Sequence, residues 1–249
     1  LVRRISEIPG IDDITLTTNA LLLAPRAAAL KEAGIGRVNI SMDTLRPDRY
    51  REITRGGNLA VAWEGIQAAL DAGLHPVKLN TVMVRGVNED ELAALARLTL
   101  NRPLHVRFIE LMPIGSSNTW AAGRYLPADE AMKQISARLG PLLPAKKPSG
   151  GGPAKYYQLK DAEGTVGFIT SMSDHFCQSC NRLRLTSVGG LRPCLYDSTE
   201  IDLKTPLREG AGLKEIADLI MDVIALKPDR HHMSDGWRDR RRVMSQIGG

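Results

Sequence analysis

In the first 113 positions, short apolar runs typical of strands alternate with segments in which apolar residues have helical spacing. Short apolar runs typical of buried strands occur at residues 13–18, 37–42, 76–84 and 104–111. Helical spacing of apolar residues separates them, around residues 25–33, 47–53, 59–72 and 89–100. Strands that alternate with helices at this spacing predict βαβ units and a parallel sheet or barrel.

The pattern changes after residue 113. It predicts a helix at 127–139, a hairpin of strands at 155–159 and 165–170, a strand at 191–196 and a helix at 212–226. The Pro, Gly and Lys residues of 141–153 predict a flexible connection. We therefore expect two domains, residues 1–115 with the βα units and residues 116–249 forming a smaller α+β domain.

Polar residues interrupt the apolar strands in a regular way. They alternate along the first two strands, where Thr17 and Ser41 lie, and Lys78 and Arg107 occupy the third and fourth. Strands of a parallel sheet are normally apolar on both faces, so this pattern predicts a hydrated or ligand-filled cavity. A buried unpaired cation is costly, which favours an anionic ligand. The alternative is that carboxylates such as Asp43 and Glu110 pair with the two cations.

The three cysteines of the chain all lie between residues 177 and 194. Cys177 and Cys180 form a C-x2-C pair, and Cys194 follows. This spacing favours soft thiolate ligands of zinc or of an iron–sulfur cluster. A disulfide would leave one cysteine unpaired, and His175 is too close to Cys177 for a typical zinc site. Three thiolates without an obvious fourth ligand suit a [4Fe–4S] cluster with one open iron.

Two arginines follow directly after the cysteine pair. The alternation in residues 181–186 predicts a strand on which Cys180, Arg182 and Arg184 share one face, while Leu183 points to the other. Guanidinium groups beside a metal site form an anion receptor. The alternative is that both arginines lie on a solvated strand face.

Charge and composition narrow the class of partner. The net charge of +5 fits an anionic ligand, whereas an aromatic content of only 4% argues against a stacking platform for nucleic acid. No apolar run is long enough to span a bilayer, so a membrane role is not expected. The chain begins at Leu1 within what reads as a helix, and we expect it to be a fragment without its N-terminus.

These segments together resemble the GTP 3′,8-cyclase family, the radical S-adenosylmethionine enzymes that open molybdenum-cofactor biosynthesis. The resemblance rests on Thr15-Leu-Thr-Thr-Asn19, Val38-Asn-Ile-Ser-Met-Asp43, Val77-Lys-Leu-Asn-Thr-Val82, Arg107-Phe-Ile-Glu-Leu-Met-Pro113, the block from Asp174 to Thr186 with its C-x2-C-Asn-Arg-Leu-Arg core, Cys194 and the terminal Gly-Gly. It implies a partial TIM-like radical SAM barrel followed by an α+β domain that carries an iron–sulfur cluster.

The resemblance also implies roles for individual residues. Cys177, Cys180 and Cys194 would hold the family's second [4Fe–4S] cluster. The implied GTP-binding residues are Thr17, Lys78, Arg107, Arg182, Leu183 and Arg184. Ser41 and Met112 match positions that contact S-adenosylmethionine, and the Gly248–Gly249 tail would reach into the active site with a catalytic role.

The reaction implied is that of a lyase. A radical derived from S-adenosylmethionine removes the 3′ hydrogen of GTP, and the sugar carbon closes onto C8 of guanine. The family's first cluster motif, C-x3-C-x2-C, does not occur in this sequence. We expect that motif, with its own [4Fe–4S] cluster, in a part preceding Leu1, so that the chain alone would be inactive. Implied partners are GTP, a homodimer and the downstream cyclic pyranopterin monophosphate synthase, in the cytoplasm.

Two other functions remain open on the residues alone. A related radical enzyme that acts on a peptide would account for the cysteines, but not for four cationic side chains suited to phosphate. A basic zinc-containing module that binds nucleic acid would account for charge and cysteines, and its affinity for DNA would fall steeply with salt.

Overall fold

A computed structural model describes residues 1–113, 123–174 and 176–230 of the chain. By their internal contacts these residues form two compact units. The first comprises Leu1–Leu111 and Arg124–Thr170, and the second comprises Met112–Gly123 and Ser171–Gly249. The boundary expected between residues 115 and 116 stays a prediction.

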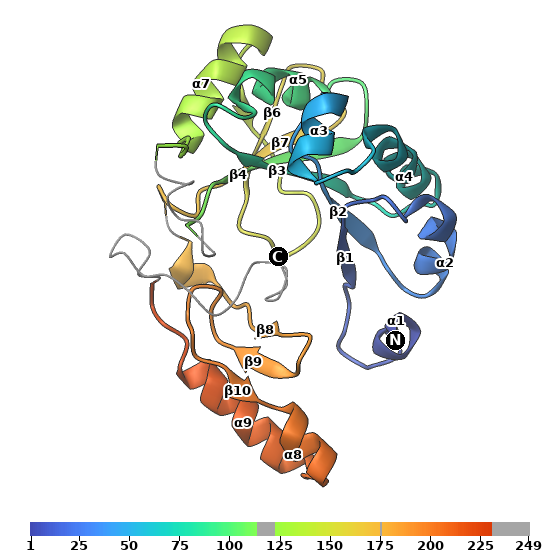
Figure 1. Cartoon of the computed structure of the whole chain (residues 1–249), viewed down its shortest axis with the longest axis vertical. Coiled ribbons are helices and arrows are strands. Elements are labelled where there is room, and N and C mark those ends of the chain that lie inside the picture. Colours follow the sequence, from blue (N-terminus) through green and yellow to red (C-terminus); the bar gives the residue numbers. More distant parts are fainter. Residues whose placement is uncertain (114–122, 175, 231–249) are drawn as a thin grey trace. The chain divides into compact units, whose positions relative to one another are not determined.

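Strands and helices alternate through most of the first unit, as the periodicity predicts (Figure 1). Its strands are β1 (Thr15–Thr18), β2 (Arg37–Ser41), β3 (Val77–Met83), β4 (Leu104–Glu110), β5 (Leu143–Pro144), β6 (Lys155–Gln158) and β7 (Thr165–Ile169). Its helices are α1 (Val2–Ser6), α2 (Ala27–Glu32), α3 (Pro47–Ile53), α4 (Leu59–Asp71), α5 (Leu92–Arg97) and α7 (Ala128–Leu139), with 3₁₀ turns η1 (Ala24–Arg26) and η2 (Glu89–Glu91).

The strands join in one sheet of order β1-β2-β3-β4-β7-β6-β5. Pairs β1–β2, β2–β3, β3–β4 and β4–β7 are parallel, so the mixed α/β fold with a mainly parallel sheet is confirmed. The hairpin of β6 and β7 also forms, with antiparallel pairing. We expected it to lie with the smaller second domain, but β7 pairs with β4 and so extends the large sheet.

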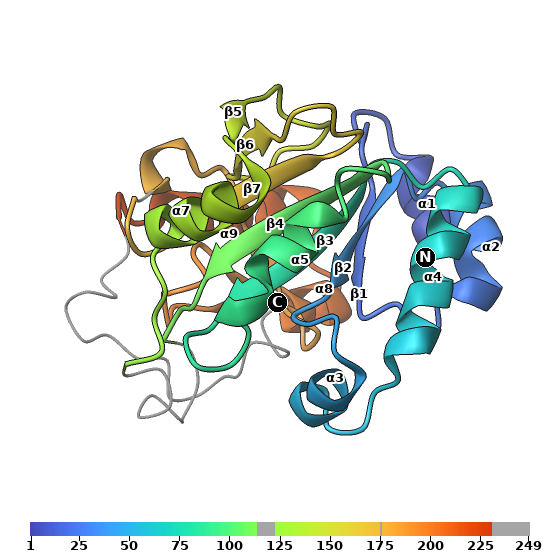
Figure 2. The same ribbon diagram turned by 90° about the horizontal axis from the view of Figure 1, so that it is seen from above.

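One face of this sheet is covered by helices (Figure 2). By strand register Val38, Ile40, Leu79 and Val106 share one face, and all four are fully buried. They pack with apolar residues of α2, α4, α5 and α7, among them Ala27, Ala62, Ile66, Leu92, Leu95, Ala131 and Ile135. Burial of one strand face under helices leaves the alternate residues of each strand on the opposite face.

Close approach of the backbone explains one glycine at the start of β7. A Cβ on Gly164 would lie 1.8 Å from the carbonyl oxygen of Leu104. No side chain fits at that distance, so only glycine lets β7 begin beside β4.

The second unit has a small antiparallel sheet and two helices. They are β8 (Arg184–Leu185), β9 (Gly190–Arg192), β10 (Ile201–Asp202), α8 (Lys204–Glu209) and α9 (Leu213–Ala225), with a 3₁₀ turn η3 (Cys177–Ser179). Leu191, Leu203 and Val223 form its core. The helix predicted at 212–226 is thus confirmed within a residue at each end.

Two strand predictions in this unit are wrong in extent. Only Arg184 and Leu185 of the alternating segment 181–186 are in a strand, and Cys194 lies after β9 rather than on it. Alternation alone does not form a strand, because a strand also needs a partner along its length. Cys180 and Arg182 therefore precede β8, and the predicted shared strand face does not exist.

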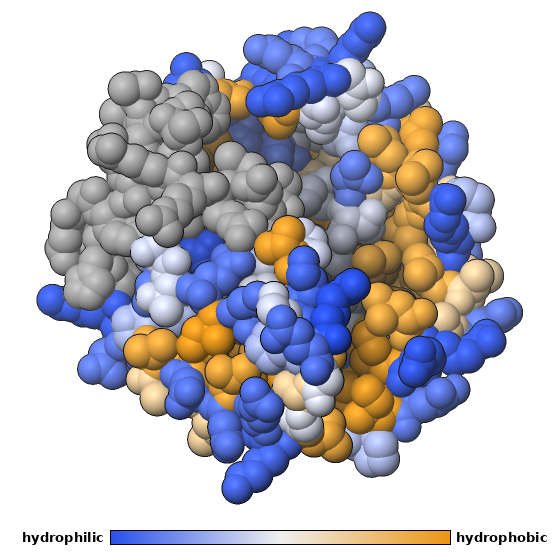
Figure 3. Space-filling model, turned by 60° about the horizontal axis from the view of Figure 1, so that its bottom comes forward, coloured by the Kyte–Doolittle hydropathy of each residue, from blue (hydrophilic) through white to orange (hydrophobic). Residues whose placement is uncertain are grey.

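On the face drawn in Figure 3, many hydrophobic residues gather along the right-hand side, and hydrophilic residues cover much of the rest of the coloured surface. Among the residues that the structure describes, no helix is both long and apolar enough to cross a membrane.

Candidate functional site

Polar side chains occupy two adjacent rows on the face of the sheet opposite the helices. Thr17, Asn39 and Lys78 are register partners across β1, β2 and β3. Asn80 and Arg107 are partners in the next row, on β3 and β4. Partners in a parallel sheet share a face, so these five residues from separate parts of the sequence lie together.

Arg107 is buried and is held by neutral groups. Its Nε donates to Oδ1 of Asn80 at 2.7 Å, and its Nη2 donates to Oδ1 of Asn39 at 2.8 Å. Burial lowers the pKa of the Arg107 guanidinium, while a hydrogen bond with Tyr156 raises it and the charge of Arg37 lowers it. The guanidinium remains charged, since arginine is not deprotonated in proteins. The two asparagines therefore fix the orientation of the Arg107 guanidinium, but they do not neutralise its positive charge.

Lys78 is also buried, with 2% of its surface exposed. Its ammonium donates to the carbonyl oxygen of Ser149 at 2.5 Å. Burial, with smaller contributions from the charges of Arg37, Arg107 and Lys147, lowers the pKa of Lys78 to about 8, although Asp13 raises it. Four cations therefore act on one another here against a single carboxylate. We call Arg37, Lys78 and Arg107 the basic cluster.

The one carboxylate acting on Lys78 is engaged by an arginine. Arg37 donates from Nε and Nη2 to both oxygens of Asp13, at distances from 2.5 to 3.0 Å. These hydrogen bonds from Arg37 hold the pKa of Asp13 below its usual range despite partial burial. Arg37 is thereby compensated, and Lys78 and Arg107 are left with excess positive charge.

Asp43 and Glu110 do not supply the missing negative charge. Asp43 accepts from the backbone N–H of Val82 at 2.8 Å, and Glu110 accepts from that of Ala128 at 3.0 Å. No salt bridge between described residues joins either carboxylate to Lys78 or Arg107. The alternative in which these carboxylates pair with the two cations is therefore wrong for the described residues.

The segment after β2 is held firmly at the carboxyl end of the strand. Ser41 is exposed at that end. Asn88 donates to the carbonyl oxygen of Asp43 at 2.8 Å, and buried Glu91 accepts from the hydroxyl of Thr44 at 2.6 Å. Burial raises the pKa of Asp43 to about 6, although a backbone hydrogen bond lowers it. Sequence reasoning did not find Asn88 or Glu91, because their partners lie about 45 residues away.

The three cysteines belong to the second unit and are all free thiols. Cys177 begins the 3₁₀ turn, and the N–H of Cys180 donates to the Cys177 carbonyl at 3.0 Å. Burial raises the pKa of the Cys180 thiol, but hydrogen bonds from the backbone and guanidinium of Arg182 outweigh it, so the net pKa is lowered. A lowered pKa favours the thiolate.

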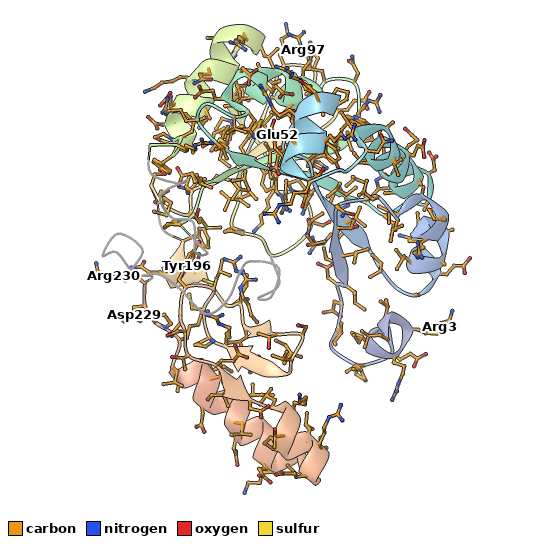
Figure 4. The ribbon with its side chains drawn as sticks, viewed as in Figure 1. Arg3, Glu52, Arg97, Tyr196, Asp229 and Arg230 are labelled. Atoms are coloured by element: carbon orange, nitrogen blue, oxygen red, sulfur yellow. The ribbon has the colours of Figure 1, made fainter. Side chains whose placement is uncertain are left out.

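Tyr196, which is labelled in Figure 4, interacts with two of the cysteines and with both arginines. Burial raises the pKa of the Tyr196 hydroxyl, with further increases from Cys194 and Cys177 and decreases from Arg184 and Arg182. The hydroxyl donates to Sδ of Met112. Burial also lowers the pKa of Arg184, which interacts with Cys194 and Cys180. The cysteines, both arginines, Tyr196 and Met112 thus lie in one neighbourhood of the second unit.

The residues of this neighbourhood fit an iron–sulfur cluster by donor chemistry. Three free thiols are the soft ligands that such clusters take. Within the described ranges, no three His, Cys, Asp or Glu side chains already converge into a group that could hold a metal ion. The donor set is therefore suitable, and its closure around a cluster stays a proposal.

The remaining predicted residues fall into two groups. Leu183 packs against the small core of the second unit rather than pointing away from a strand. Gly248 and Gly249 lie outside the described residues. The structure brings Thr17, Lys78 and Arg107 together in the first unit, and Cys177, Cys180, Cys194, Arg182, Arg184 and Met112 together in the second.

Sequence reasoning missed several neighbours of these groups. Arg37 and Tyr156 interact with Arg107, and Tyr196 and Phe176 contact the cysteine segment. The alternation of β2 could have indicated Arg37, because it precedes Asn39 by two residues on the polar face. No local signal points to Tyr156, since it reaches the site from the added hairpin.

Two family models match the chain. The Radical SAM superfamily model matches residues 1–99, and the Molybdenum Cofactor Synthesis C model matches residues 104–233. Proteins named GTP 3′,8-cyclase are similar over all 249 residues. The one from Pelotomaculum thermopropionicum is 78% identical, and those from Desulforamulus reducens and Moorella thermoacetica are 57% and 55% identical. In each case the match covers 100% of this chain and 76% of the relative.

Proposed function

The chain belongs to the GTP 3′,8-cyclase family, and from this premise we propose that it converts GTP to (8S)-3′,8-cyclo-7,8-dihydroguanosine 5′-triphosphate in molybdenum-cofactor biosynthesis. The observation that carries the proposal is the basic cluster, in which buried Lys78 and Arg107 have no carboxylate partner among the described residues. A triphosphate supplies the negative charge that these cations lack.

The matched families imply iron–sulfur clusters and S-adenosylmethionine. Bound together, these groups supply one-electron radical chemistry. The peptide-modifying enzyme and the zinc-containing nucleic-acid module are not favoured, because the relatives carry the cyclase name over the whole chain. The lyase class, the homodimer, the downstream synthase and the cytoplasmic location stay predictions.

The first unit would bind the triphosphate of GTP. Arg107 presents a guanidinium held in place by Asn39 and Asn80, and Lys78 presents an ammonium. Charged hydrogen bonds to phosphate contribute about 1.5–3 kcal/mol each. Thr17 borders the same row and accepts from Asn39 at 3.4 Å, which leaves its own hydroxyl hydrogen for a phosphate oxygen. Because these groups are already oriented, little ordering is required when GTP binds.

The second unit would hold the auxiliary cluster through Cys177, Cys180 and Cys194. A [4Fe–4S] cluster with three thiolate ligands offers one open iron position, which suits the guanine base. Arg182 and Arg184 act on the same neighbourhood and would provide further hydrogen-bond donors for GTP. Their effect is to hold the nucleotide in one orientation, as a reaction at a single sugar hydrogen requires.

The S-adenosylmethionine contacts would come from Ser41 and Met112. Ser41 is exposed at the end of β2, where the next residues are held by Asn88 and Glu91. Met112 receives the hydroxyl hydrogen of Tyr196 at its sulfur. The residues after Ser41 are held by buried side chains and the sulfur of Met112 is held by Tyr196, which favours fixed contacts over mobile ones.

Anaerobic iron–sulfur reconstitution followed by EPR of the reduced protein tests the proposal. We expect a [4Fe–4S] signal that GTP perturbs and that Cys180→Ser reduces. A matched control is Ser179→Ala, an exposed neighbour in the same turn, which should leave the signal unchanged. Uptake of zinc in place of iron, or a signal indifferent to GTP, would contradict the role assigned to the three cysteines.

A further inference from the structure

The glycine-rich segment Lys147–Pro153 lies directly against the basic cluster, although its composition predicts only a flexible connection. We call this segment the glycine loop. Its Ser149 carbonyl accepts from Lys78 Nζ at 2.5 Å. A Cβ on Gly150 would lie 2.5 Å from the guanidinium carbon of Arg37, and a Cβ on Gly152 would lie 3.5 Å from Nη1 of Arg107. The loop backbone thus passes close to all three cations.

Glycine is required at the closest of these approaches. Gly150 has a φ of +111°, a conformation that other residues rarely adopt, and its missing Cβ makes room for the Arg37 guanidinium. A loop that served only as a connection would have no reason to bring its backbone this near to a cation. The glycines therefore indicate that the loop backbone itself takes part in what the cluster binds.

The loop contributes donors rather than acceptors. The backbone N–H groups of Gly150, Gly151 and Gly152 donate to no protein acceptor in the part of the chain that the structure describes. Lys147 is close enough for its charge to lower the pKa of Lys78. Unpaired N–H groups of a glycine-rich loop next to a lysine provide the donors that phosphate oxygens accept from. The Ser149 carbonyl is an acceptor rather than a donor, and it occupies the position on Lys78 that an anionic oxygen would take.

We propose that the glycine loop is a phosphate clamp, in which Lys147 and the N–H groups of Gly150–Gly152 bind the terminal phosphates of the nucleotide while Lys78 exchanges the Ser149 carbonyl for a phosphate oxygen. This inference rests on the proposed GTP site and adds a second, loop-borne side to it. The clamp distinguishes ligands by the number of phosphates, because a monophosphate lacks the terminal phosphates that the loop would bind.

Calorimetric binding of GTP, GMP and inorganic triphosphate to the full chain tests the clamp. We expect Lys147→Ala to weaken GTP and triphosphate about tenfold, the loss of one charged hydrogen bond, and to leave GMP unchanged. Lys146→Ala is the matched control, since Lys146 is an exposed lysine one residue away and is not among the charges that act most strongly on Lys78. It should change each affinity less than about twofold.

Further variants separate the clamp from the site on which it rests. Lys78→Met should weaken triphosphate binding whether or not the loop takes part. If it does so while Lys147→Ala behaves like Lys146→Ala, the clamp is overturned and the basic cluster stands. If the wild type binds neither GTP nor triphosphate, both are overturned. Binding of triphosphate without GTP would leave the clamp in place and remove the proposed function.

Hydrogen exchange of the loop provides a readout that needs no variant. In the wild type, exchange at Gly150–Gly152 should slow at least fivefold when triphosphate is added, because their N–H groups become hydrogen-bonded. Unchanged exchange at saturating triphosphate would contradict the clamp directly.

Discussion

Lys78→Met should make the ligand-free protein more stable while it weakens GTP binding. The pKa of Lys78 falls from its ordinary value of 10.5 to about 8 in the folded protein, chiefly because of burial. Near pH 7 Lys78 is still charged in the folded state, so the folded protein carries the cost of burying that charge. Methionine has a similar length, carries no charge and leaves the Ser149 carbonyl at an exposed residue where water can bond to it.

The size of the effect follows from the pKa. A fall from 10.5 to about 8 corresponds to about 3 kcal/mol of free energy of unfolding. Because the ammonium of Lys78 contacts the carbonyl of Ser149, an exposed residue, we reduce this to about 1.5 kcal/mol for solvent screening. Below pH 8 both states are protonated and the full penalty applies. Between pH 8 and 10.5 the unfolded state binds more protons, so wild-type stability rises with pH and the penalty disappears.

Urea unfolding of both proteins followed by circular dichroism measures the difference. We expect Lys78→Met to be about 1.5 kcal/mol more stable than the wild type at pH 7, with the difference vanishing near pH 10.5. Lys133→Met is the control in the same unit, because the Lys133 side chain is 80% exposed and pairs with Asp129 at the surface. It should stay within about 0.5 kcal/mol of wild type at every pH. A destabilised Lys78→Met protein, or a pH-independent difference, would refute this reasoning.

Three further predictions concern other parts of the molecule. Arg184→Ala should weaken GTP binding by about 1.5–3 kcal/mol in calorimetry. Arg208→Ala, at the exposed end of α8, is the control and should have no effect. If the two variants bind GTP with equal affinity, Arg184 does not belong to the GTP site. Asp43→Asn should raise the free energy of unfolding by up to about 3 kcal/mol above pH 6. Burial raises the pKa of Asp43 from 3.8 to about 6, so the wild type loses stability as the pH rises through this range. If the free energy of unfolding depends on pH with the same slope in both proteins, this prediction is wrong. Gly164→Ala should lower the free energy of unfolding by about 3 kcal/mol or more in thermal unfolding, since the new Cβ would lie 1.8 Å from a backbone oxygen. Gly151→Ala is the control: it has open space around it and should cost less than about 1 kcal/mol. If Gly164→Ala is tolerated, β7 is able to move away from β4.

Local pattern was a sound guide wherever one segment's own periodicity decides its structure. The βα alternation of residues 13–111 and the helix at 212–226 are present as expected, because amphipathic periodicity specifies which face is buried before any partner is known. The strand expected over 181–186 is present only at Arg184 and Leu185. Its alternation is real, but the neighbouring strand β9 pairs with just these two residues.

The sequence by itself indicated the alternation of strands and helices, the three thiols and the cationic residues Lys78 and Arg107, since each can be recognised within single segments. Only the tertiary structure decided that β7 extends the large sheet and that the glycine loop meets the basic cluster. The contact of Lys78 with Ser149 joins residues 71 positions apart. Such a contact depends on strand register and on the close approach of backbone to side chain, and neither leaves a signal in the periodicity of either segment.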